Sequence, residues 1–200
     1  MRTDDINGRI SPWGDVFLTP LIESDSDLLY EWQNSPKIRD STMGFRFPVQ
    51  KNTVKDWIKK VEEQNSKSQV VYAIRLKTDF VGIVSLHQIQ QYQRKSLLGI
   101  YLGDSAHHGK GIGFVAMCLI LDFAFNGLDF RKVSLEVVES NQSAINLYKR
   151  IGFINEGLKR EEYFVGGKYL NTQLFGILNH EFKIDIPDDA NRLVLMNNER

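Results

Sequence analysis

The chain has 200 residues, 42% of them hydrophobic, and a formal net charge of zero. This size and composition predict one globular domain, and the balanced charge argues against a nucleic-acid or anionic-membrane partner. No apolar run reaches membrane-spanning length, residues 1–9 are unlike a secretory signal, and the single cysteine, Cys118, excludes an internal disulfide. We therefore expect a cytoplasmic protein.

The first part of the chain predicts a strand followed by two helices. Residues 16–18 favour a strand, and residues 24–34 favour a helix with acidic residues at its start, which the helix dipole stabilises. A proline is expected to end that helix, and residues 35–50 are expected to form a loop. Thr53 and Asp56 resemble a capping box. They would open a helix whose apolar residues share one face: Val54, Trp57, Ile58 and Val61.

Strand patterns dominate the middle of the chain. Residues 70–76 and 80–88 are rich in β-favouring residues and are separated by a short polar turn, which predicts a hairpin. A further strand is expected over residues 96–103. Residues 114–125 are apolar nearly all round and predict a buried helix. Residues 133–138 alternate between two faces, as a strand does.

The C-terminal part predicts one more helix and a last hairpin. Asn141 suits the N-cap of a helix, and Gly152 suits its C-terminal cap. The sequence Val-Gly-Gly-Lys at residues 165–168 predicts the turn of a hairpin. We expect one domain over residues 1–182 and a C-terminal appendage over residues 183–200, packed on another subunit of a homodimer. Strands interrupted by helices indicate an α/β or α+β domain.

A glycine-rich segment, His-Gly-Lys-Gly-Ile-Gly at residues 108–113, lies between a predicted strand and a predicted helix. Glycines let the backbone approach a ligand closely, and the N–H groups and dipole of a helix N-terminus favour a phosphate. A Walker loop needs Ser or Thr after Gly-Lys, and a dinucleotide fingerprint needs a different glycine spacing. The segment therefore predicts a phosphate cradle of another kind.

A second segment, residues 141–153, reads Asn-Gln-Ser-Ala-Ile-Asn-Leu-Tyr-Lys-Arg-Ile-Gly-Phe. Together the two segments resemble the GCN5-related N-acetyltransferase (GNAT) family, with its (Gln/Arg)-x-x-Gly-x-(Gly/Ala) pyrophosphate loop and its Asn-x-x-Ala-x-x-x-Tyr-x-x-x-Gly-Phe segment. The loop departs from the family only at its first position, His108. The resemblance covers roughly residues 15–182. It implies a mixed, twisted sheet of about seven strands, flanked by helices and splayed between its fourth and fifth strands.

The resemblance also implies an acetyl-CoA-dependent N-acetyltransferase that moves the acetyl group directly to a primary amine. The cofactor would lie in the split of the sheet. The residues expected to bind it are Tyr101, Leu102, Gly103, His108, Gly109, Lys110, Gly111, Ile112, Gly113, Phe114 and Asn141. No metal is expected, because the histidines lack further ligands at useful spacing.

Two residues are candidates for proton transfer. Tyr148 lies seven residues after Asn141, about two helical turns, so both project from one side. In the family, a tyrosine at this position commonly protonates the coenzyme A sulfur; the alternative is a half-buried packing residue. Glu136 is the preferred base, since ribosomal-protein alanine acetyltransferases have a similar Leu-Glu-Val segment. The alternative is that Glu136 is a structural carboxylate paired with Lys or Arg. An ordered water would then be the base.

The acceptor-binding candidates are Arg39, Arg46 and His87, with the pair Glu161 and Glu162 as secondary candidates. Arginines suit a phosphate or a carboxylate, and residues 80–182 resemble enzymes that act on nucleotide-linked amino sugars, which are our first prediction. The same region resembles spermidine and ribosomal-protein N-terminal acetyltransferases. An alternative of another class is a non-catalytic acyl-CoA-binding regulatory module.

Overall fold

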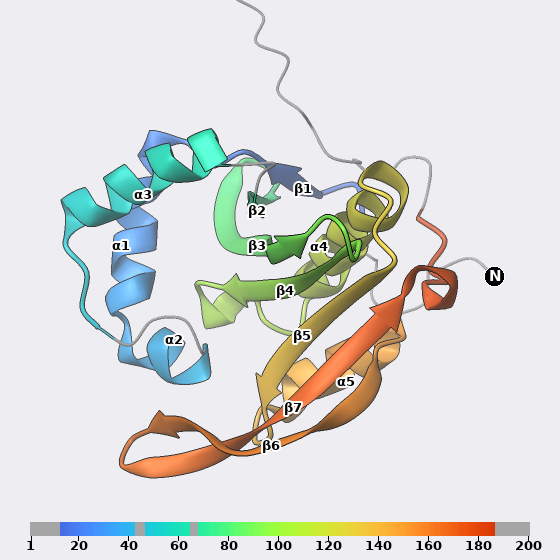
Figure 1. Cartoon of the computed structure of the whole chain (residues 1–200). Coiled ribbons are helices and arrows are strands. Elements are labelled where there is room, and N and C mark those ends of the chain that lie inside the picture. Colours follow the sequence, from blue (N-terminus) through green and yellow to red (C-terminus); the bar gives the residue numbers. More distant parts are fainter. Residues whose placement is uncertain (1–12, 43–46, 65–67, 187–200) are drawn as a thin grey trace, which may run out of the picture.

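The computed structural model describes residues 13–42, 47–64 and 68–186. In this part of the chain seven strands form one sheet in the order β1-β2-β3-β4-β5-β7-β6 (Figure 1). The strands are β1 (Val16–Thr19), β2 (Gln69–Leu76), β3 (Asp79–Gln90), β4 (Lys95–Leu102), β5 (Lys132–Val138), β6 (Ile154–Val165) and β7 (Lys168–Leu178). Each predicted strand is present.

Helices cover both faces of this sheet. One face packs against α1 (Ser26–Asn34), α2 (Pro36–Ser41) and α3 (Lys51–Gln64), and we call it the α1–α3 face. The other face packs against α4 (Ile112–Asp122) and α5 (Gln142–Ile151), and we call it the α4–α5 face. Short helical turns complete the chain: η1 (Glu23–Asp25), η2 (Ser105–His107), η3 (Phe123–Gly127) and η4 (Asn179–Glu181).

The sheet splits between β4 and β5, the one parallel pair of neighbours within the described residues. These strands pair only at Lys95–Lys132, Ser96–Val133 and Leu97–Ser134. Beyond that point they diverge toward α2 and the tip of the β6–β7 hairpin (Figure 1). The mixed sheet and the split after its fourth strand confirm the predicted fold.

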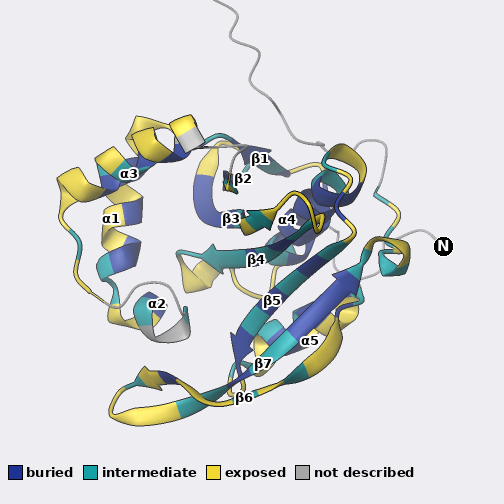
Figure 2. Ribbon diagram, viewed as in Figure 1, coloured by how far each residue is buried: buried dark blue, intermediate teal, exposed yellow. Residues whose placement is uncertain are grey.

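Helix α4 is the most buried helix, and it fixes the loop that precedes it. Every side chain from Phe114 to Leu121 is buried. A helix that is apolar all round is stable only when it is covered on all sides. Figure 2 shows α4 in dark blue behind the sheet, whereas the tip of the β6–β7 hairpin is largely exposed. The loop between β4 and α4 is therefore held at both ends by the core.

Two sequence predictions near the first helices were wrong. The predicted loop over residues 35–50 contains the short helix α2, because Pro36 occupies the first helical turn, where its fixed φ and missing N–H are favourable. Helix α3 begins before Thr53, so Thr53 is not its N-cap. The amide of Asn34 bonds both backbone groups of Val49, at 3.0 and 3.2 Å, and this sets the entry into α3.

The start of the predicted C-terminal appendage packs on the chain's own core. Ile184 and Ile186 are partly buried against the α4–α5 core, and Phe182 lies 5.7 Å from the ring of Phe125. Residues 187–200 lie outside the described residues.

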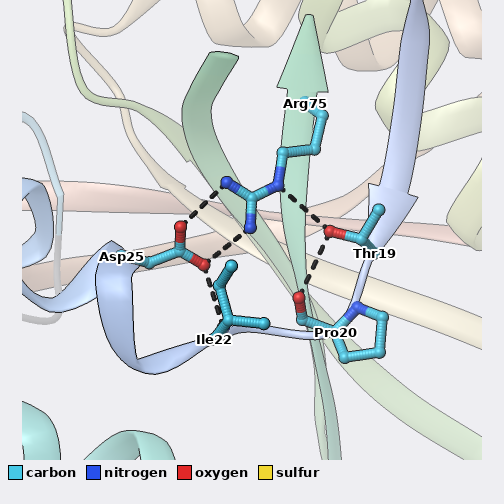
Figure 3. Close-up of polar contacts among 5 residues, drawn as sticks. All are labelled: Thr19, Pro20, Ile22, Asp25 and Arg75. Carbon is cyan, nitrogen blue, oxygen red and sulfur yellow. Dashed lines mark hydrogen bonds and ion pairs between the residues drawn. The ribbon is translucent and has the colours of Figure 1, made fainter. Parts of the chain in front are cut away.

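A buried ion pair joins the first helical segment to the sheet (Figure 3). The guanidinium of Arg75 on β2 donates to both carboxylate oxygens of Asp25, at 2.8 and 2.7 Å, and through Nε to the hydroxyl of Thr19 at 3.1 Å. The Asp25 carboxylate also accepts the N–H of Ile22 at 3.0 Å. The side chains of Asp25 and Arg75 are only 4% and 11% exposed. This network anchors the start of α1 beside β1 and β2.

Loss of this pair should lower the free energy of unfolding far more than loss of a surface ion pair. Asp25→Ala leaves the buried Arg75 charge unpaired, and we expect the free energy of unfolding to fall by about 3–5 kcal/mol. Glu23→Ala removes the exposed Lys55–Glu23 pair, with its 3.2 Å contact, and should cost less than about 1 kcal/mol. Urea denaturation of both variants measures this; equal losses would contradict it.

Candidate active site

The loop after β4 has the geometry of an anion cradle. Gly109 and Gly111 have φ angles of 71° and 80°, which L side chains rarely adopt, and Gly111 is the N-cap of α4. No side chain caps this helix, so the N–H groups of its first turn point toward the loop without a side-chain acceptor. Backbone donors and the helix dipole thus converge where a pyrophosphate would bind.

The cofactor candidates of this loop differ in how their side chains lie. His108 and Lys110 are exposed, whereas Ile112 and Phe114 are buried in the core. At Gly113, a Cβ would lie 3.6 Å from the side chain of Leu147 on α5. The buried residues of the loop therefore offer a ligand only their backbone, while the exposed pair also offers side chains.

The end of β4 is enclosed by aromatic residues of the α1–α3 core. A Cβ at Gly103 would lie 1.8 Å from the ring of Trp32, so the indole occupies the space of a side chain there. Trp32 also meets the ring of Tyr101 edge-on at 6.2 Å. The Gly103 N–H donates to the Val81 carbonyl at 3.0 Å, so it is already used within the sheet. Leu102 packs against the opposite core.

Tyr148 lies on α5, against the α4–α5 face of the second half of the sheet. Asn141 caps this helix by accepting the Ala144 N–H at 3.2 Å, as predicted. The Tyr148 side chain is buried, with its ring 6.0 Å from Phe153 and 6.2 Å from Phe175. Burial raises the pKa of its phenol to about 12. The hydroxyl is therefore protonated at neutral pH and able to act as a proton donor.

Glu136 lies on β5 and faces the α1–α3 side, as do Ser134 and the facing residues of β4. Its carboxylate accepts a hydrogen bond from Lys159 Nζ at 2.7 Å, and Lys159 also lies 3.3 Å from Glu162. The hydrogen bond that Lys159 donates to Glu136 is the largest cause of its raised pKa. The structure therefore has the paired carboxylate that the sequence analysis gave as the alternative to a free base. Tyr148 and Glu136 lie on opposite faces of the sheet.

His87 lies on β3, on the same face as Glu136. It pairs with Leu97 of β4, which in turn pairs with Ser134 of β5 at the last rung before the split. A Cβ placed at Gly99 would lie 3.4 Å from the His87 ring. The imidazole therefore lies over the part of β4 that has left β5. Burial lowers the His87 pKa, which favours the neutral ring.

The acceptor candidates on the N-terminal side are only partly described. Arg39 lies on α2 and is half-buried, whereas Arg46 lies outside the described residues. The hydroxyl of Tyr163 on β6 donates to the Thr42 carbonyl, just after α2, at 2.6 Å. This bond joins two segments 121 residues apart in the chain. It joins the end of α2 to the β6–β7 hairpin at the mouth of the split (Figure 1).

A bulge in β6 contains the acidic candidates Glu161 and Glu162. The sequence analysis missed this bulge. Lys159 pairs with Thr172 and Tyr163 with Leu170, so three residues of β6 oppose Asn171 alone. A hollow of about 650 Å³ lies over the bulge, lined by Leu158, Lys159, Arg160, Glu161, Glu162 and Asn171. Because β6 is polar on both faces, its sequence carries no pattern that would set its register.

The chain is similar in sequence to one known family of proteins. A family model described as "Acetyltransferase (GNAT) domain" matches residues 15–154. The chain belongs to the GNAT family. It is therefore an acyltransferase, an N-acetyltransferase that uses acetyl-CoA.

Individual relatives agree with this assignment. An uncharacterized prophage-derived N-acetyltransferase of Bacillus subtilis, YokL, is 28% identical over 70% of this chain and 77% of its own length. A spermidine N(1)-acetyltransferase of Vibrio cholerae is 31% identical over 52% of this chain and 60% of its own length. The chain thus matches less than two thirds of that enzyme.

Solved structures share the fold at low sequence identity. The crystal structure of a Vibrio cholerae spermidine N-acetyltransferase with CoA and spermine has a TM-score of 0.76 and 24% identity, covering 84% of this chain and 98% of that one. The microcin C7 self-immunity acetyltransferase MccE, solved with acetyl-CoA and AMP, has a TM-score of 0.72 and 20% identity, covering 86% and 97%.

Neither a metal-binding cluster nor a membrane-spanning helix is found among the described residues. They contain no group of three or more His, Cys, Asp or Glu side chains placed to hold a metal ion. None of their helices combines the length and the apolar character needed to cross a membrane.

The cradle should lose affinity for coenzyme A when a negative charge enters it. Gly111→Asp places a carboxylate at the N-cap of α4, against the ligand's phosphates, and we expect Kd to rise at least about tenfold, or ~1.4 kcal/mol. Gly166→Asp is a matched control, because Gly166 has a φ of 57° at the hairpin turn. It should leave Kd within about twofold. Calorimetry measures both; similar affinities would refute the cradle.

Proposed function

We propose that this protein transfers the acetyl group of acetyl-CoA directly to a primary amine, with the thioester between β4 and β5. The parting of the two strands after Leu97 and Ser134 carries the proposal. It leaves backbone groups of both strands facing one wedge, and the cradle at residues 108–113 lies beyond the end of β4. Phosphates bound at the cradle would leave the rest of the cofactor to extend along β4.

Tyr148 is the proposed proton donor to the departing thiolate. It projects from α5, which packs on β5 and β7, and burial keeps its hydroxyl protonated. Asn141 and Gly152 hold the helix at its two ends, so the ring position is set by capping as well as by packing. Holding the two substrates together supplies a further part of the rate.

The acceptor side supports two classes of amine. Arg39 suits the phosphates of a nucleotide-linked amino sugar, the acceptor predicted from the sequence. Glu161 and Glu162, beside the β6 hollow, suit a cationic amine instead. The second candidate acceptor is therefore a polyamine, the class that the Vibrio cholerae relative acetylates by its name.

Removing the phenol hydroxyl should slow turnover without weakening cofactor binding. Tyr148→Phe keeps the ring and its contacts, and we expect kcat to fall about 10²–10⁴-fold with the acetyl-CoA Kd unchanged. Tyr72→Phe, at another buried tyrosine, is the matched control and should keep wild-type kcat. Steady-state kinetics with a panel of amines decides the matter. No turnover by wild type with any amine would favour a non-catalytic acyl-CoA-binding module.

Removing positive or negative side chains should change KM in opposite directions for the two acceptor classes. For a nucleotide-linked amino sugar, replacing Arg39 and Arg46 by Ala should raise KM about tenfold, ~1.4 kcal/mol, and added salt should raise it further. For spermidine, Glu161→Gln with Glu162→Gln should raise KM, and loss of the arginines should lower it. KM values for both substrates on both double mutants give the answer. Efficient spermidine acetylation with no amino-sugar activity would overturn the first choice.

A further inference from the structure

On the α1–α3 face, the side chains of Ser85 and His87 on β3 close over Gly99 of β4, beside the split. Gly99 is the second residue of β4 after its last pairing with β5, and it faces the same side as Ser85 and His87. A Cβ at Gly99 would lie 3.2 Å from the Ser85 hydroxyl and 3.4 Å from His87 Cε1. The missing side chain therefore lets the imidazole lie close against the peptide of β4 at the split.

Other groups bound this stretch of β4 at both ends. Toward the cradle, Trp32 covers Gly103. At the closed end of the split, Leu97 and Ser134 are paired. Gly99 lies three residues before the end of β4 at Leu102, which is about 10 Å in an extended strand. A cofactor that extends inward from the cradle along β4 would therefore come beside the His87 imidazole.

We propose that His87 is the proton acceptor for the attacking amine, which approaches from the α1–α3 face. This inference rests on the proposed acetyl transfer. As the nitrogen–carbon bond forms, the amine nitrogen gives its proton to the neutral imidazole. As the carbon–sulfur bond breaks, Tyr148 on the other face gives its proton to the thiolate. The imidazolium and phenolate return to their starting forms by proton exchange with solvent.

The surrounding charges support His87 in this role over Glu136. Charged side chains on this face of the sheet include Arg75 on β2, Lys95 on β4, Lys132 and Glu136 on β5, and Lys159 on β6. Arg75 is paired with the buried Asp25. Glu136 is engaged by Lys159 at 2.7 Å, and Lys132 is engaged by Glu156 at 2.6 Å. On β2 the residue paired with His87 is the neutral Gln69, and on β4 the titratable Tyr101 is held neutral because burial raises its pKa.

The test compares variants of the full chain on the best amine of the panel above. We expect His87→Gln to lower kcat about 10²–10⁴-fold while the coenzyme A Kd stays within about twofold. His180→Gln, at an exposed histidine of η4, is the control and should match wild type. The acid limb of the wild-type kcat profile should lie below pH 6.5, the ordinary histidine value, since burial lowers the His87 pKa. His87→Gln should lose that limb.

Two further variants make the test independent of this one substitution. Added imidazole should partly restore kcat in His87→Ala. Gly99→Ala should lower kcat or raise the amine KM, because its methyl group would press on the His87 imidazole, 3.4 Å from an ideal Cβ, with coenzyme A binding retained. Wild-type kcat and an unchanged acid limb in His87→Gln would overturn the assignment and leave acetyl transfer standing, as would full activity of Gly99→Ala. Absence of turnover by wild type would overturn both.

Discussion

The parting of β4 from β5 is the constraint on which the molecule depends. Backbone N–H and C=O groups in a sheet need partners, yet β4 and β5 pair over only three rungs in the middle of the sheet. Such an interruption survives only if each half is held from outside. The first half is held by the α1–α3 core and the Asp25–Arg75 pair. The second half is held by α5 and its aromatic contacts with Phe153 and Phe175.

Helix α4 and the β6–β7 hairpin also connect the halves beyond the three shared rungs. Helix α4 packs behind β1, β3 and β4 on one side and reaches α5 on the other. On the open side, the Tyr163 hydroxyl holds the hairpin to the Thr42 carbonyl. The split is thus bounded at its closed end by strand pairing, behind by an apolar helix, and at its mouth by the Tyr163–Thr42 hydrogen bond. Its shape depends on packing from segments remote in sequence.

The sequence predicted the elements near the cofactor better than those near the acceptor, for physical reasons. Apolar periodicity and caps are local signals, so the buried helix α4, the alternating β5 and the Asn141-capped α5 could all be predicted. The β6 bulge depends on a partner strand and has no local pattern. The Glu136–Lys159 pair likewise depends on which residue of β6 lies across β7 from Glu136. The proline of α2 was misjudged because proline both ends and begins helices.

The contact between Trp32 and Gly103 couples substitutions at two positions that are distant in the sequence. The indole fills the volume that any side chain at residue 103 would need, with its nearest atom 1.8 Å from an ideal Cβ. Adding even one methyl to such a packed site costs about 1–3 kcal/mol. A side chain at position 103 is therefore easier to accommodate when position 32 is smaller. Substitutions at the two positions are energetically coupled, although 71 positions separate them in the chain.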